Sequence, residues 1–92
     1  MNDIRQQLID RASASMSQYP QYKGQFDRYV LCRVKRTIKT KRGVAFTKGE
    51  VTICDPDNFP DVGLAEMCNH RSVWSFTNKC GTLLDNSDLE LL

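Results

Sequence analysis

The chain has 92 residues, of which 40% are hydrophobic and 26% charged, and this is the composition of one small folded domain. It excludes a disordered tail, which would bury too little apolar surface to fold. No apolar run approaches the roughly 20 residues that cross a bilayer, and the first residues, MNDIR, lack the apolar core of a secretion signal. We therefore expect a single domain over residues 1–92, in the cytoplasm and without a membrane partner.

The net charge of +2 hides an uneven distribution. Seven of the thirteen Lys and Arg residues lie within residues 32–48, a stretch without an acid. The rest of the chain contains the other six together with all eleven Asp and Glu, so its net charge is −5. The seven are Arg33, Lys35, Arg36, Lys39, Lys41, Arg42 and Lys48. Such a patch attracts polyanions by neutralising phosphates.

A helix is expected within residues 1–18. Apolar side chains recur there at helical spacing, at Ile4, Leu8, Ile9, Ala12 and Met16. Asn2 or Asp3 can cap the start, and Tyr19-Pro20 ends the helix. Tyr19 and Tyr22, in the connector that follows, are expected to pack over the edge of the core.

An antiparallel sheet is expected from residue 26 to residue 92. Residues 26–40 alternate between apolar and polar, which is typical of one half-buried strand, and the alternation aims Arg33, Lys35, Lys39 and Lys41 to one side. Turns are expected at Gly43, at Lys48-Gly49 and at residues 78–81. A short helix is expected near residues 60–68, and the last segment, residues 87–92, closes the chain.

This order of elements predicts an α+β fold, with the N-terminal helix packed on a small antiparallel β-sheet. The run FTKGEV at residues 46–51 resembles the turn that follows the first loop of SH3-like barrels. The tail, from VWSF at residues 73–76 through Gly81 to LELL at residues 89–92, is also similar to the end of such a barrel. The resemblance covers about half of the chain and implies a partly open SH3-like barrel.

The four cysteines, Cys32, Cys54, Cys68 and Cys80, are widely spaced and form no C-x-x-C pair. In a cytosolic chain we expect reduced thiols, and a disulfide only in an oxidising compartment. Zinc would need Cys54, Cys68 and Cys80 together with His70, a spacing unlike the paired ligands of zinc sites. We expect neither a metal nor any other cofactor.

Catalysis has little support in the sequence, and we expect no enzyme and no small-molecule substrate. A phosphate loop and a G-x-S-x-G elbow are both absent. His70 is the one histidine, with Cys68 or Cys80 as conceivable partners, but a third, orienting group is not apparent. The cationic stretch therefore provides the candidate site, through contacts of its seven basic residues with nucleic-acid phosphates. Aromatic residues near it are few, Tyr29 and Phe46, which argues against base stacking there.

A second resemblance concerns residues 29–43, with the sequence YVLCRVKRTIKTKRG. This segment and the size of the chain resemble a phage-encoded anti-CRISPR protein that inhibits type I-F surveillance complexes. The resemblance implies a non-enzymatic inhibitor that binds Cas subunits and guide RNA in the host cytoplasm and blocks target DNA hybridisation. Arg33, Lys35, Lys39 or Lys41 would then lie near the guide RNA, or the acidic surface would mimic DNA. The alternative is a small SH3-like module that binds DNA or RNA directly.

Overall fold

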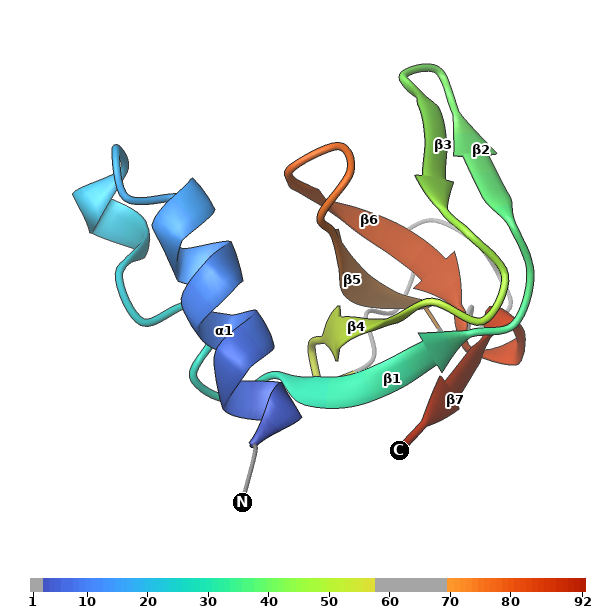
Figure 1. Cartoon of the computed structure of the whole chain (residues 1–92), viewed down its shortest axis with the longest axis horizontal. Helices are drawn as coiled ribbons and strands as arrows, with labels where there is room; N and C mark the ends of the chain where they lie inside the picture. Colours follow the sequence, from blue (N-terminus) through green and yellow to red (C-terminus); the bar gives the residue numbers. More distant parts are fainter. Residues whose placement is uncertain (1–2, 58–69) are drawn as a thin grey trace, which may run out of the picture.

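The computed structural model describes residues 3–57 and 70–92, and Figure 1 shows one helix beside a curled antiparallel sheet. The elements in chain order are α1 (Ile4–Ser15), η1 (Pro20–Tyr22), β1 (Val30–Val34), β2 (Ile38–Thr40), β3 (Gly43–Phe46), β4 (Val51–Cys54), β5 (His70–Ser75), β6 (Cys80–Asp85), η2 (Asn86–Asp88) and β7 (Leu89–Leu91). The expected helix near residues 60–68 lies outside the described residues.

The N-terminal helix forms as its apolar spacing predicts. Asp3 caps it, because its side chain accepts a hydrogen bond from the backbone N–H of Gln6 at 3.1 Å. Leu8, Ile9 and Ala12 are buried against the sheet, whereas Ile4, expected on the same stripe, is exposed. The buried stripe is therefore shorter than the sequence pattern indicated.

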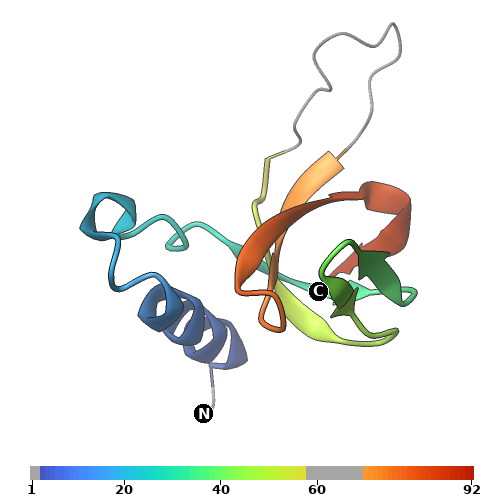
Figure 2. The same cartoon turned by 90° about the horizontal axis from the view of Figure 1, so that it is seen from above.

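Two antiparallel sheets make up the rest of the described fold. Five strands follow the order β6-β5-β4-β1-β7, and β2 and β3 form a separate two-stranded hairpin inserted between β1 and β4. The five-stranded sheet curls into a half-barrel (Figures 1 and 2), which confirms the α+β class and agrees with a partly open barrel.

The curled sheet buries side chains on both of its faces. Its inner face contributes Cys32, Val34 and Val73 to a core that Ile38, Ala45 and Phe46 of the hairpin complete; Cys54, Leu84 and Leu89 also belong to it. Its outer face contributes Ile53 and Trp74 to a second core, covered by α1 and by Phe26; Leu8, Ile9 and Ala12 are the helical members. The helix and the hairpin therefore stabilise opposite faces of one sheet.

The expected single strand over residues 26–40 is wrong. The chain bends at residues 35–37, so β1 and β2 lie in different sheets. The backbone N–H of Lys35 donates to the carbonyl of Asp88 at 2.8 Å, a contact that local alternation does not reveal. Arg33 and Lys39 are consequently not on one continuous strand face.

The hairpin itself contains an irregularity that the sequence pattern missed. Ile38 pairs with Phe46 but Lys39 pairs with Val44, so Ala45 is an extra residue and β3 is bulged. The bulge turns both Ala45 and Phe46 into the core and leaves Val44 exposed. The expected turn at residues 40–43 is confirmed, with Gly43 at a positive φ of 103°.

Candidate anion-binding site

The seven basic residues of the cationic stretch are all exposed, but the bend divides them into two groups. We call residues 33–37 and 47–50 the root, and residues 38–46 the arm. Four of the seven lie at the root, namely Arg33, Lys35, Arg36 and Lys48, and three lie on the arm, namely Lys39, Lys41 and Arg42. Figure 1 shows the β2–β3 arm standing beside the half-barrel, at the opposite end of the molecule from α1.

The root contains two ion pairs with the C-terminal segment. The guanidinium of Arg36 donates to both carboxylate oxygens of Asp88, at 2.8 and 3.1 Å. This contact raises the pKa of Arg36, first through the hydrogen bond and then through the charge of Asp88. Arg33 lies 3.7 Å from a carboxylate oxygen of Glu90, its partner across the β1–β7 pair. Two of the seven expected anion-binding residues therefore already contact carboxylates.

The arm has a different environment. Among residues 3–57 and 70–92, no carboxylate forms an ion pair with Lys39, Lys41 or Arg42, and the same holds for Lys35 and Lys48 at the root. One guanidinium nitrogen of Arg42 lies 3.8 Å from the sulfur of Cys80. Lys39 lies opposite Val44 in the ribbon, and Lys41 and Arg42 form its turn. The arm therefore presents three positive charges that form no ion pair with an acid of residues 3–57 or 70–92.

Contacts with the β5–β6 hairpin hold the arm in place. The hydroxyl of Ser75 donates to the carbonyl of Ala45 at 2.8 Å, and this bond is buried. The side-chain amide of Asn78 donates to the hydroxyl of Thr40 at 3.3 Å. Because Ile38, Ala45 and Phe46 also belong to the inner core, the charges of the arm stand on a packed ribbon. A charged group held in place loses less conformational freedom when it binds a ligand.

The aromatic residues near the cationic stretch are not available for stacking. Phe46 is completely buried, and Tyr29 is half-buried with its ring 5.1 Å from that of Phe26. Burial raises the pKa of Tyr29. Base stacking on either ring at the arm is therefore not supported.

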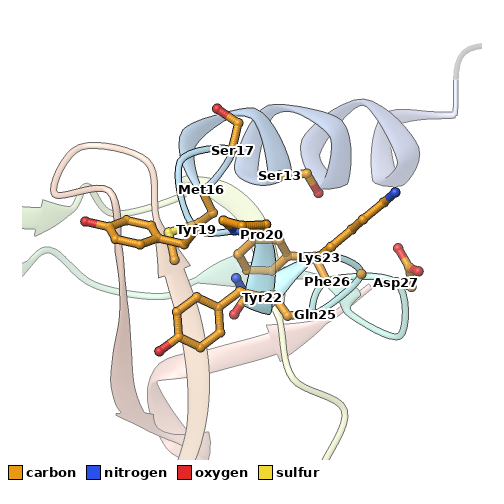
Figure 3. A pocket seen from close by; sticks show the side chains of 11 residues that line it. Ser13, Met16, Ser17, Tyr19, Pro20, Tyr22, Lys23, Gln25, Phe26 and Asp27 are labelled. Carbon is orange, nitrogen blue, oxygen red and sulfur yellow. The ribbon is translucent and has the colours of Figure 1, made fainter.

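Tyr19 and Tyr22 are the aromatic residues that the sequence interpretation placed wrongly. Expected at the core edge, they are 43% and 49% exposed, because the turn η1 carries them away from the sheet. Their rings meet edge to face, with 6.2 Å between the centroids. Both line a pocket of about 460 Å³ between the end of α1 and η1 (Figure 3).

Among the described residues, Cys80, one of the two partners that the sequence suggested for His70 in a catalytic pair, lies far from that histidine. On the β5–β6 ladder His70 pairs with Asp85 and Ser75 pairs with Cys80, which separates His70 from Cys80 by five residues, roughly 17 Å. Cys54 is buried in the inner core beside Cys32. Their mutual hydrogen bond, with burial, raises the pKa of Cys32, and the same bond lowers that of Cys54.

Cys32, Cys54 and Cys80 are free thiols, and Cys68 lies outside the described residues. Within the described ranges, no three His, Cys, Asp or Glu side chains are grouped closely enough to hold a metal ion. In the same part of the chain, no helix has the length and apolarity needed to cross a membrane.

Comparisons with known proteins identify no relative of this chain. No family model, no curated protein and no solved structure matches it.

Proposed function

We propose that this protein is a non-enzymatic module that binds the phosphate backbone of nucleic acid with its arm. The observation that carries the proposal is the trio Lys39, Lys41 and Arg42, exposed on a docked ribbon and without an acidic partner among the described residues. Lys35 and Lys48 at the root can extend the contact. Lys and Arg side chains bind phosphates by releasing condensed counterions, without reading the base sequence.

The simpler explanation is that the lysines only protect a sheet edge, because charged residues there prevent association between sheets. Two observations favour binding. At the root, two arginines form ion pairs with carboxylates, so the positive charge there is partly neutralised within the fold. The arm, by contrast, has no acid in its sequence and meets none from its neighbours in the described part of the chain.

A more specific proposal is inhibition of a CRISPR-Cas surveillance complex in the host cytoplasm, with the arm on the guide RNA. It draws support from the resemblance of residues 29–43 to an anti-CRISPR protein. The charge distribution favours it too: the cationic stretch has five cations without an ion pair to any described residue, which predicts modest affinity for free nucleic acid, so that tight binding would need additional protein contacts. Occupying the guide RNA or its groove would block target DNA hybridisation.

The direct test removes the three charges of the arm through Lys39→Gln, Lys41→Gln and Arg42→Gln together. We expect about a hundredfold loss of affinity for an oligonucleotide near 100 mM salt, and a slope of log K against log salt that falls by about two. The matched control lowers the net charge equally, by Gln7→Glu, Ala14→Glu and Leu83→Glu at exposed positions off the arm. Equal losses in the two triple variants would contradict the proposal, because net charge alone would then explain binding.

A second measurement separates direct binding from inhibition of a ribonucleoprotein. Direct binding through four or five phosphates should weaken by roughly a hundredfold between 50 and 200 mM salt. An inhibitor should instead bind a purified type I-F surveillance complex tightly across that range and prevent it from pairing with target DNA. Absence of any effect on target pairing at saturating protein would refute the inhibitor and leave the direct binder.

A further inference from the structure

The pocket between α1 and η1 has the composition of a ligand site. Its volume of about 460 Å³ lies within the usual range for small-ligand pockets, and its wall is mostly apolar, with Met16, Pro20 and Phe26 beside the two tyrosines. Figure 3 shows the rings of Tyr19 and Tyr22 on one side of the pocket and the side chains of Lys23 and Asp27 on the other. It therefore combines two exposed aromatic rings with one cation, Lys23, and one carboxylate, Asp27.

A chain of contacts connects α1, whose end borders the pocket, with the arm. The guanidinium of Arg11, on α1, lies 4.4 Å from the ring centre of Phe76, at the start of the turn between β5 and β6. The same turn exposes Lys79 and binds the arm through Asn78 and Thr40. The contacts therefore run from the helix to the turn and from the turn to the arm.

The cations along this route form no ion pair within the described part of the chain. Among the described residues, no carboxylate forms an ion pair with Lys23, Arg11 or Lys79, as is also true of Lys41 and Arg42. The spacing suits an extended polyanion better than a compact one, because η1 and the arm lie at opposite ends of a molecule 40 Å long (Figure 1). A duplex presents its bases inside the stack, whereas a single strand can place a base on an exposed ring.

We infer that the pocket is a nucleobase subsite for single-stranded nucleic acid whose phosphates run over Lys79 to the arm. The inference rests on the proposed function. It adds that the nucleic acid is single-stranded and that the pocket is a second contact point beside the arm. A base stacks on Tyr19 or Tyr22, Lys23 contacts a flanking phosphate, and the carboxylate of Asp27 can accept a hydrogen bond from an N–H of the base, such as N3–H of thymine. The strand needs about eight nucleotides, a site size known for small single-strand-binding folds.

The test compares a labelled oligo-dT of about twelve nucleotides with an abasic oligonucleotide of equal length, which keeps the phosphates and lacks the bases. The wild-type protein should bind oligo-dT at least about fivefold more tightly than the abasic strand. The double variant Tyr19→Leu, Tyr22→Leu should lose that preference and leave abasic binding unchanged. Tyr19→Phe with Tyr22→Phe, which keeps both rings, should retain it, and thermal unfolding checks that the variants are folded.

The outcomes separate the two proposals. If the double variant Tyr19→Leu, Tyr22→Leu binds both strands as the wild type does, or if a duplex of equal length binds as tightly as the single strand, the subsite inference is overturned. If the arm triple variant still weakens binding of the abasic strand, the proposed function survives that result. If the arm variant weakens binding of neither strand, the proposed function itself falls, and the subsite inference falls with it.

Discussion

The root and the arm of the cationic stretch have the same residue types within one short segment, yet their surroundings differ. At the root, Arg33 and Arg36 meet carboxylates of the C-terminal segment, whereas Lys39, Lys41 and Arg42 on the arm meet none in the described part of the chain. The difference teaches that a run of positive charge in a sequence is not one functional unit. Part of it joins distant segments of the fold, and the remainder forms no ion pair with the described residues.

The comparison between root and arm requires that one face of the arm packs in the inner core. Two substitutions on β3 test this packing, and one of them should have the largest effect of all on the free energy of unfolding. Phe46 is completely buried and Val44, two residues before it, is 40% exposed. We expect Phe46→Ala to lower the free energy of unfolding by about 3–5 kcal/mol because it leaves a cavity. Val44→Ala should cost less than about 0.5 kcal/mol. Denaturant unfolding measures both.

Should Phe46→Ala fail to fold, Phe46→Leu keeps the test measurable, with an expected loss of about 1 kcal/mol. Equal, small losses at positions 44 and 46 would mean that the arm is not packed on the barrel. The fixed placement of its three charges would then have no structural basis.

The next test removes a contact at the root and measures both the stability of the fold and its affinity for an oligonucleotide. The side chain of Asp88 is 17% exposed, and the substitution Asp88→Asn removes the charge that Arg36 contacts. Stability should fall, by a few degrees in Tm, while affinity for an oligonucleotide should rise by about fivefold, because one guanidinium becomes available for a phosphate. Opposite changes in stability and binding are the signature of a structural root beside a functional arm.

The pair Arg28–Asp57 serves as the control for this test. It is also an ion pair, at 3.3 Å, but both side chains are largely exposed, 77% and 65%. Removing it by Asp57→Asn should change neither stability nor binding measurably. If Asp88→Asn weakened binding instead, Asp88 would have to orient the arm, and the division between root and arm would be too simple.

Local patterns were sufficient for those elements whose cause lies within a few residues. The helical spacing of Leu8, Ile9 and Ala12 predicted α1, and Gly43 predicted the turn of the arm. The bend at residues 35–37 was missed, because one of its contacts, between Arg36 and Asp88, joins residues 52 positions apart. The exposure of Tyr19 and Tyr22 was missed for a similar reason: only the path of η1 away from the sheet decides it.

The candidate site was predictable as a set of charges but not as an arrangement. Composition identified all seven basic residues, and the alternating pattern then placed Arg33 and Lys39 on one strand face, which the bend prevents. The bulge at Ala45 was likewise invisible, since it depends on the pairing of Ile38 with Phe46. Pairing register is a property of two strands together, and a single strand's periodicity does not determine it.

The smallest expected effect is that of low pH, which should loosen the contacts of the root before those of the arm. Asp85 begins the turn η2 that carries Asp88, and its side chain accepts a hydrogen bond from the backbone N–H of Ser87 at 2.8 Å. That bond lowers the pKa of Asp85 below its ordinary value. A carboxyl whose pKa is lower in the folded state stabilises the fold above its unfolded pKa, about 3.9, and the contribution is lost as pH falls through the folded value.

Thermal unfolding of the wild type and of Asp85→Asn between pH 7 and pH 2 measures this contribution. The wild type should be slightly more stable near neutrality, and the gap in Tm should close as pH falls below about 4. An unchanged gap down to pH 2 would show that the charge of Asp85 is not what stabilises η2. Because η2 places Asp88 against Arg36, loosening it should release the root contact while leaving Lys39, Lys41 and Arg42 as they were.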